Sequence, residues 1–405
     1  MNKKLILFTI IASSIITLLA GDIFLPSLPQ IAEYFAVNNS MVQLSISFFL
    51  GGQVFATLFW GTCADNIGRK KTFALGMSLF FIGTIACLLS ATIYSFLLGR
   101  LIQGMGSVVV PVVGWALIQD MYPKDESAGV MSWVGGIVSL APMAAPFLGG
   151  QITKYVSWKG DFYFIAFTTS AVLAVICMLP KNLPTNKKID APKHAIRQYG
   201  EMLRNKLFIS YVSLFALLAC GEWCFLTILP FLFTHKMHLS EDKIGFFLSL
   251  SASFFILGAL IAPRFLKQLG IVRLLSIGTT ASVLSGIILL SMHFLSTYNP
   301  LFISLAFGFY LFCGALLWGS SSSRALQCYE EQRGSASAVR SLLLVSFFAV
   351  GSYLGTLIRN DTLLDISLML IFFSISSMLL CFSITLMNRR VTLRRHSGPA
   401  SPNIN

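Results

Sequence analysis

The sequence predicts an all-α membrane protein in which two bundles of six transmembrane helices follow one another along the chain. Three observations lead to this fold class. Hydrophobic residues make up 56% of the chain and charged residues only 11%, which is far more apolar than a soluble protein of this size. The apolar residues also gather in runs of about 20 residues, the length that a helix needs to cross a bilayer. Finally, a long polar segment divides these runs into two groups of six.

Each apolar run is expected to be a helix, because backbone polar groups inside a bilayer must be satisfied within the segment. In chain order the expected spans are residues 5–25, 41–60, 72–93, 96–118, 129–152, 162–180, 207–233, 244–263, 274–295, 300–323, 338–358 and 363–387. The segment between the sixth and seventh spans is basic and contains two prolines, which is typical of a linker. The expected organisation is a first bundle over 1–180, a basic cytoplasmic linker over 181–206, a second bundle over 207–388 and a disordered cytoplasmic tail over 389–405.

The distribution of basic residues predicts the orientation of the chain. If the N-terminus is cytoplasmic, so are the even-numbered connections and the tail, and these hold most of the 29 lysines and arginines. The exceptions are Lys154, Lys159, Lys236, Lys243 and Arg359 on the outer side, and Arg100 inside a span. The positive-inside rule therefore places both termini in the cytoplasm. The same alternation argues that the net charge of +13 does not mark a nucleic-acid surface.

The beginning of the chain has a second interpretation, because it also resembles a secretory signal peptide with a cut after Ala20. Such a cut would leave eleven spans and remove one member of the repeat described next. The eight cysteines lack metal-ligand spacing and lie mostly in apolar spans, so we expect small core residues and no metal site. His235 and His238 are interpreted as solvated loop residues, and no soluble-type catalytic motif is present.

A weak internal repeat relates the two groups of spans. Asp22 follows a glycine late in the first span, and Glu222 follows a glycine late in the seventh. The connection 61–71 is matched by 263–273 at the same place in the second bundle. The two acids are therefore expected on helices that face each other. The first helix is expected to continue past its prolines toward Tyr34, which would place Asp22 in its interior.

The connection GTCADNIGRKK at 61–71 carries the most specific motif. It resembles the signature loop of the major facilitator superfamily, which has the form G-x-x-x-D-x-x-G-R-[RK]-[RK]. The resemblance implies a cytoplasmic latch that holds the two halves together while the cavity opens outward. The matching residues are Gly61, Asp65, Gly68, Arg69 and Lys70.

Two further motifs lie inside spans. In LGRLIQG at 98–104, Arg100 followed by Gln103 and a glycine resembles the family's fourth-helix motif, which is linked to proton movement. An arginine inside a membrane helix is usually functional. The alternative is that Arg100 lies about 9 Å from the outer end of its helix and extends to the surface.

The fifth span resembles the antiporter signature of drug:proton exporters. Its prolines and paired glycines predict a bent helix that packs closely on a neighbour. The motif residues are Pro142, Pro146, Gly149 and Gly150. Ala145 stands where the signature usually has a glycine, which weakens the inference of transport direction.

Taken together, DIFLPSLP, QDMYPKDES, LAPMAAPFLGG and VSWKGDFYF resemble the bicyclomycin and chloramphenicol resistance branch of the 12-helix drug:proton antiporters. The resemblance is specific over residues 20–165 and rests on topology alone over 207–388. In one departure, Gln119 stands where that branch usually has an arginine before the aspartate. The sequence therefore gives no reason to expect a charge pair at Asp120.

The resemblance implies a proton-coupled exporter of lipophilic drugs or toxic small molecules that works by alternating access in a bacterial inner membrane. Asp22 and Glu222 would carry protons, and Arg100 would hold one of these acids deprotonated. The aromatic residues Phe24 and Trp223 would contact substrate, and Gln103 would line the same cavity.

The expected partners are a small-molecule substrate, protons and the lipid bilayer, with no nucleic acid and a monomeric chain. The proton gradient would supply the energy, and no cofactor or enzymatic activity is expected. The alternative is a dedicated exporter, less readily an importer, of one metabolite such as a siderophore, a sugar or an amino acid. A transporter-like sensor or an intramembrane enzyme has no support beyond the embedded acids.

Overall fold

The computed structural model describes residues 3–180, 193–329, 332–358 and 362–396, and every regular element in these ranges is a helix. Twelve helical spans in them are long and apolar enough to cross a membrane, which confirms the predicted number and order. They are Lys3–Phe35, Asn39–Ile67, Arg69–Leu88, Ile93–Met121, Gly129–Tyr155, Trp158–Met178, Lys206–Met237, Glu241–Leu269, Ile271–Phe294, Pro300–Gln327, Gly334–Thr356 and Leu363–Met387.

The spans differ in continuity between the two halves. The first half contains α1 (Lys3–Asp22), the 3-10 helix η1 (Leu25–Ser27), α2 (Leu28–Phe35), α3 (Asn39–Ile67), α4 (Arg69–Leu88), α5 (Ile93–Ser107), the π-helix η2 (Val110–Gly114), α6 (Trp115–Met121), α7 (Lys124–Val138), α8 (Ala141–Tyr155) and α9 (Trp158–Met178). The second half contains α11 (Lys206–Met237), α12 (Glu241–Leu269), α13 (Ile271–Phe294), α14 (Pro300–Gln327), α15 (Arg333–Thr356) and α16 (Leu363–His396). Three spans of the first half are thus built from several pieces, whereas every span of the second half is one helix.

Because the spans alternate in direction, the connections between them lie on two faces of the molecule. We call the face at which α1 begins the terminal side and the opposite face the distal side. The terminal side carries the connections near residues 68, 122 and 270, and the described ends near 180, 193–205, 329 and 332. The distal side carries the connections near residues 36–38, 89–92, 156–157, 238–240, 295–299 and 357–362.

Backbone geometry supports the internal repeat. α3 and α12 both have 29 residues, and each ends at a glycine with positive φ, 89° at Gly68 and 74° at Gly270. Before each of these helices stands a residue in the left-handed region, Ala36 at φ 51° and His238 at φ 50°. Positive φ is uncommon outside glycine, so this agreement marks equivalent positions in the two halves. The matching positions have the spacing of the sequence repeat.

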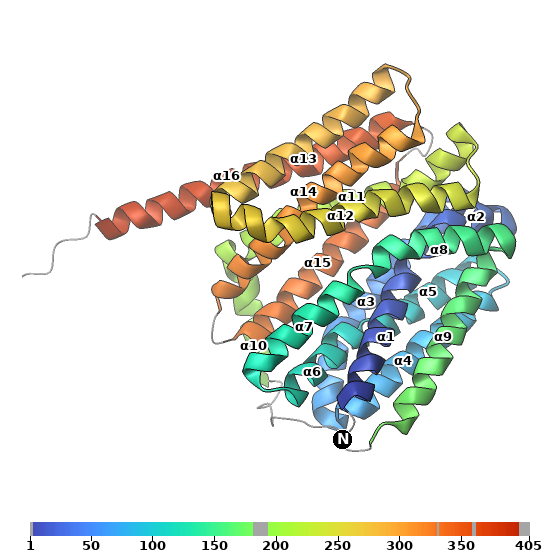
Figure 1. The fold of residues 1–405 in the computed structure, drawn as a ribbon, viewed down its shortest axis with the longest axis horizontal. Helices are drawn as coiled ribbons and strands as arrows, with labels where there is room; N and C mark the ends of the chain where they lie inside the picture. Colours follow the sequence, from blue (N-terminus) through green and yellow to red (C-terminus); the bar gives the residue numbers. More distant parts are fainter. Residues whose placement is uncertain (1–2, 181–192, 330–331, 359–361, 397–405) are drawn as a thin grey trace, which may run out of the picture.

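The two halves lie side by side as separate bundles (Figure 1). α1 to α9 form one bundle, and α11 to α16 form the other. α3 packs against α15 and α8 packs against α12, so these two helix pairs form most of the contact between the halves. α11 adds contacts with η1, α2 and α3. The fold is therefore two six-helix bundles that face each other across α3, α8, α11, α12 and α15.

The linker and the tail differ in part from our expectation. α10 (Lys193–Arg204) forms a helix within the segment 181–206 and packs against α15 and α11, with Met202 buried. α16 continues to His396, so the expected disorder is wrong for residues 389–396. Residues 181–192 and 397–405 lie outside the described residues.

Candidate functional site

The first span breaks at Asp22. α1 ends there, and the chain passes through η1 before it continues as α2 to Phe35. The break has a local cause: Pro26 has no N–H to donate to the carbonyl of Asp22, so the α-helical pattern cannot continue. The span thus reaches past Tyr34, as predicted, but Asp22 is the last residue of α1 rather than an interior residue of one helix. The acid therefore lies where the α-helical hydrogen-bond pattern of the first span is interrupted.

Glu222 lies on the unbroken helix α11 of the second half. The carboxyl groups of Asp22 and Glu222 interact electrostatically, although they belong to different halves. Both side chains are partly exposed, while Gly21 and Gly221 beside them are buried. The two acids that the repeat pairs thus lie within electrostatic range of each other. Both acids keep some accessible surface, which a proton-binding group requires.

Trp223 follows Glu222 and is partly buried. Its ring stacks on Phe348 of α15 with the ring centroids 5.9 Å apart. Because its ring is only partly buried, Trp223 can line the site.

Arg100 of α5 is completely buried, so it does not extend to the membrane surface. Its guanidinium carbon lies 4.1 Å from the ring centroid of Phe24 and 4.3 Å from that of Phe49. Two aromatic faces thus enclose the cation, an arrangement that stabilises it where water is absent. The guanidinium also interacts electrostatically with Asp22.

Hydrogen bonds fix the position of the Arg100 guanidinium. Its Nη1 donates to the carbonyl of Ala20, at 3.1 Å, and to Oε1 of Gln103. Its Nε donates to the carbonyl of Ser45 at 3.5 Å. Nε2 of Gln103 donates to Oγ1 of Thr84 at 2.9 Å, which extends the network to α4. Arg100 thus connects α5 with the end of α1 that carries Asp22, and with α3.

Two predicted cavity residues, Phe24 and Gln103, are buried in this network. Both side chains have 0% exposure, because Phe24 covers the guanidinium and Gln103 bonds it. In this conformation neither residue lines an open cavity. The sequence placed them beside charged residues but did not indicate which side of each helix faces the protein interior.

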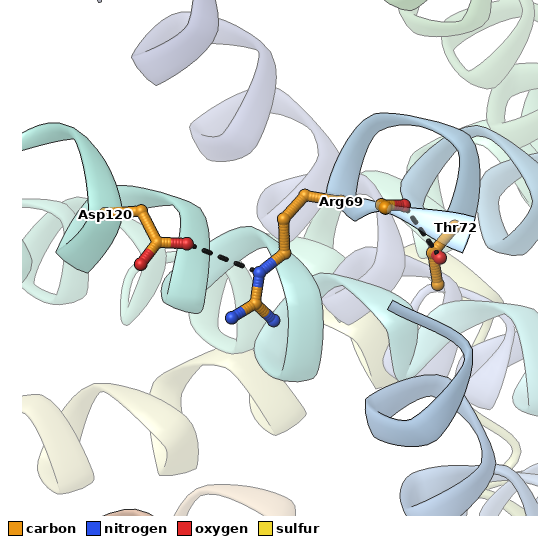
Figure 2. A network of polar contacts seen from close by, with 4 residues as sticks. Arg69, Thr72 and Asp120 are labelled. Atoms are coloured by element: carbon orange, nitrogen blue, oxygen red, sulfur yellow. Dashed lines mark hydrogen bonds and ion pairs between the residues drawn. The ribbon is translucent and has the colours of Figure 1, made fainter. Parts of the chain in front are cut away.

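The latch motif lies at the terminal side, between α3 and α4. Arg69 forms an ion pair with Asp120 of α6, with Nε 3.3 Å from Oδ2 (Figure 2). The hydroxyl of Thr72 donates to the carbonyl of Gly68 at 3.0 Å, within the first turn of α4. Asp120 therefore has a charge partner although position 119 is a glutamine. The cation is Arg69 of α4 rather than an arginine at position 119.

The remaining latch residues also pack within the first half. Gly61 lies inside α3, and Gly68 supplies the positive φ between the two helices. Nζ of Lys70 donates to the carbonyl of Leu179 at the end of the sixth span. Asp65 is exposed and interacts electrostatically with Arg69.

The linker helix α10 lies close to the latch. Burial raises the pKa of Tyr199, and the negative charge of Asp65 raises it further. Tyr199 also packs on the hydrophobic core of the protein. The exposed acid of the motif therefore has the linker as a neighbour in this conformation.

The fifth span bends as its prolines predict. α7 ends at Val138 and α8 begins at Ala141, with Pro142 in the first turn of α8 and Pro146 inside the helix. Gly149 lies against the backbone at the break in the first span, since a Cβ atom there would be 1.6 Å from the carbonyl oxygen of Ile23. The antiporter motif therefore packs directly on the segment that follows Asp22.

The same helix forms a close contact between the two halves. A Cβ atom at Gly150 would be 2.4 Å from the carbonyl oxygen of Glu241. One at Gly245 of α12 would be 2.2 Å from the carbonyl oxygen of Pro146. Such distances are too short for any side chain, so the glycines permit the backbones of α8 and α12 to approach.

We expect Gly150→Ala and Gly245→Ala to hold the halves apart on the distal side. The added methyl group meets backbone, which cannot rotate away, so the closed arrangement is disfavoured and transport falls. Cysteine-reactive reagents applied to single-cysteine variants from the distal side measure this opening. Gly136→Ala is a matched control, since a Cβ atom there meets nothing within 4 Å. Equal labelling of all three alanine variants would contradict the expectation.

Polar contacts between the halves concentrate near the distal side. Within the described residues, the hydrogen bonds that join the halves are Asn39 to His235 at 3.3 Å, Gln43 to the Thr227 carbonyl at 3.0 Å, Ser47 to Ser352 at 3.0 Å and Lys154 to Asp242 at 2.9 Å. The last of these is also an ion pair. The halves are therefore held together at their distal ends.

Sequence reasoning missed two ionisable residues inside spans. Asp161 of α9 is fully buried, and its Oδ2 accepts hydrogen bonds from Ser27 at 3.2 Å and Thr153 at 3.1 Å. It thereby ties η1 and α8 to α9. Arg340 of α15 lies within the eleventh span and inside the expected range 338–358, but it was not singled out. For Arg340, the available signal was a charge inside an apolar run.

Twelve spans in two matching halves, with ionisable side chains enclosed where the halves meet, define a membrane transport protein. A family model described as Major Facilitator Superfamily matches residues 10–352. The chain therefore belongs to the major facilitator superfamily, a family of transporters, which confirms that it is not an enzyme.

The chain is similar to two named resistance proteins. It is 27% identical over 345 residues to the bicyclomycin resistance protein homolog of Haemophilus influenzae, covering 84% of this chain and 85% of that protein. It is 28% identical over 326 residues to the multidrug resistance protein MdtL of Escherichia coli strain K12 / DH10B, covering 80% and 81%. These relatives agree with the branch that the sequence motifs resemble.

Solved structures agree in fold. A D-xylose–proton symporter has a TM-score of 0.75 at 14% identity, covering 93% of this chain and 97% of that chain. A peptide transporter POT, solved in complex with sulfate, has a TM-score of 0.75 at 16% identity, covering 95% and 94%. At these identities the likeness shows the fold alone.

Proposed function

We propose that this protein exports lipophilic small molecules, including drugs, in exchange for protons by alternating access. The observation that carries the proposal is the meeting of Asp22 and Glu222, two partly exposed acids contributed by opposite halves. Acids inside a membrane protein are costly, so those present usually have a function. The names of the two resistance relatives support drug efflux.

We place the terminal side in the cytoplasm of a bacterial inner membrane, because most basic residues lie there. The distal contacts then close the periplasmic side, and the conformation is the one that receives substrate from the cytoplasm. Substrate binding near the acids displaces protons toward the cytoplasm. After the distal contacts break and the halves rock, periplasmic protons reload the acids and the substrate leaves.

Arg100 serves this cycle as a fixed positive charge beside the break. Its hydrogen bond to the Ala20 carbonyl holds the end of α1, and its charge favours the deprotonated form of Asp22. A change in the α1 break changes the distance between these two groups. Proton affinity and the shape of the first span are therefore linked in this proposal.

The latch motif acts in the other half of the cycle, when the terminal side closes. In the conformation seen here, Arg69 and Lys70 bond within the first half. We propose that Asp65, which is exposed, meets the second half when the terminal side closes. The chain works as a monomer in this scheme.

A resistance and efflux panel tests the function. Cells that lack their own efflux pumps and express this protein are expected to survive at least about fourfold higher concentrations of several unrelated lipophilic inhibitors, and to retain less of a fluorescent one. Cells expressing the Asp22→Asn variant at equal levels are the control. Protection against a single compound would instead identify a dedicated exporter, and no protection against any compound would contradict drug efflux.

A further inference from the structure

Arg340 is a cation within the eleventh span, and it forms no ion pair with any carboxylate among the described residues. It lies seven residues into α15, or about 10 Å from the terminal end of that helix. The ion pairs within the described parts of the chain are Arg69–Asp120 and Lys154–Asp242, so Arg340 has no acid within 4.0 Å there. A guanidinium inside a membrane protein is costly unless an anion or good acceptors satisfy it.

The known contacts of Arg340 leave donors unused. Its Nη1 donates to Oγ of Ser322 on α14 at 2.8 Å. Its Nε is buried and has no hydrogen-bond partner among the described residues. Because a guanidinium carries five N–H groups in a planar fork, Arg340 retains the geometry that binds a carboxylate or phosphate through two hydrogen bonds.

An exposed aromatic ring shares a helix face with the hydroxyl that binds this cation. Trp318 is one helical turn before Ser322, so the two side chains share a face of α14. The ring of Trp318 contacts Phe215 of α11 and Phe255 of α12, with centroids 6.4 Å and 5.8 Å apart. Yet 40% of the side chain remains exposed. The cation thus bonds a hydroxyl that lies one helical turn from a partly exposed ring.

The cation, the hydroxyl and the ring belong to the side of the second half that faces the first half. α11, α12 and α15 are helices through which the second half packs on the first, and the cluster joins all three of them to α14. Along α15, Arg340 lies about 18 Å closer to the terminal side than Ser352, which bonds across to Ser47. The cluster is therefore on the terminal side of the contacts that hold the halves together.

We propose that Arg340, Ser322 and Trp318 form a substrate subsite for an organic anion or zwitterion that carries an apolar or aromatic body. The guanidinium and hydroxyl bind the acidic group, and the indole covers the apolar part. This proposal rests on the proposed export function and refines its substrate class. Because the cluster lies toward the terminal side, the anionic group is bound when the site receives substrate from that side.

Equilibrium binding to the purified full-length chain in uncharged detergent tests the subsite. The probes are naphthylacetate and its uncharged amide, which differ only in the acidic group. The wild-type protein is expected to bind the carboxylate about tenfold more tightly than the amide, since hydrogen bonds to a charged acceptor are stronger than those to a neutral one. Arg340→Gln removes most of this preference, and Ser322→Ala removes part of it. Trp318→Leu lowers the affinity for both probes by a similar factor.

Arg273→Gln is the matched control, because Arg273 is exposed on α13, which packs against α14 and α16. Its preference for the carboxylate should equal that of the wild type. The proposal is overturned if the wild type shows no preference or if Arg340→Gln retains it. It is also overturned if phosphatidylglycerol competes with naphthylacetate but naphthylacetate is never transported, since the cation would then bind a lipid headgroup.

The two proposals fail in distinguishable ways. Binding is measured without a proton gradient, so Asp22→Asn protein that cannot couple transport still shows the carboxylate preference if the subsite is correct. Conversely, loss of that preference in Arg340→Gln with intact export of uncharged compounds leaves the export function standing. Size-exclusion profiles and thermal unfolding of each variant show that it is folded.

Discussion

The Asp22→Asn variant is expected to lose substrate-driven proton exchange. Asparagine keeps the size of the side chain but cannot bind and release a proton in the transport cycle. In everted vesicles loaded with a pH-sensitive dye, adding a transported compound should move protons in the wild type and produce a signal at least about tenfold smaller in the variant, because a protonation step contributes on this scale. Substrate binding in the absence of a gradient should change much less.

Two further variants show whether the acid itself is responsible. Asp22→Glu retains a carboxyl group and should recover part of the exchange. Glu222→Gln removes the other acid and should also reduce coupling, because the two carboxyl groups interact. Normal proton exchange in Asp22→Asn would remove Asp22 from the mechanism, even if Glu222→Gln were inactive.

Arg100→Lys is expected to reduce transport at least about tenfold although the positive charge is kept. An ammonium group is compact, so it cannot bond the Ala20 carbonyl, the Ser45 carbonyl and Gln103 while lying between two aromatic rings. Breaking a buried charged network typically costs about 3–5 kcal/mol. Initial transport rates in reconstituted vesicles measure the effect.

The pH profile of transport separates a positioning role of Arg100 from loss of folding. If the guanidinium favours deprotonated Asp22, then Arg100→Gln should shift the profile as well as lower the rate, while the protein remains folded. Lys159→Gln is the matched control, because Lys159 is also a cation of the first half but bonds the exposed Tyr34 hydroxyl. An Arg100→Lys variant with the wild-type rate would show that charge alone suffices.

The sequence was sufficient to predict the twelve spans and their pairing. Apolar length decides whether a segment crosses a bilayer, and this information is local. The repeat was also readable, because Gly68 and Gly270 must be glycine for backbone reasons that neighbouring residues do not change. At such positions the residue type alone indicates the backbone conformation. Short sequence motifs are therefore sufficient to locate them.

Other features depend on which side of a helix faces the protein, and the sequence did not determine this. Phe24 and Gln103 enclose Arg100 instead of lining a cavity. Asp120 forms an ion pair with Arg69, which belongs to a different span. The break at Asp22 was overlooked because the prolines were interpreted as part of a continuous helix. Arg340 was missed because a charge near the end of a span resembles one in a connection.

The chemistry of the distal contacts determines how strongly they respond to the ionic strength of the surrounding medium. Among the described residues, three of the four hydrogen bonds named above between the halves involve amide, hydroxyl, imidazole or carbonyl groups, and the fourth, Lys154 with Asp242, is an ion pair. Dissolved salt screens exposed charge pairs strongly but has little effect on hydrogen bonds between neutral groups. Closure of this face should therefore be nearly as stable in a saline medium as in a dilute one. The contacts at the distal side would therefore persist when the salinity of the medium changes.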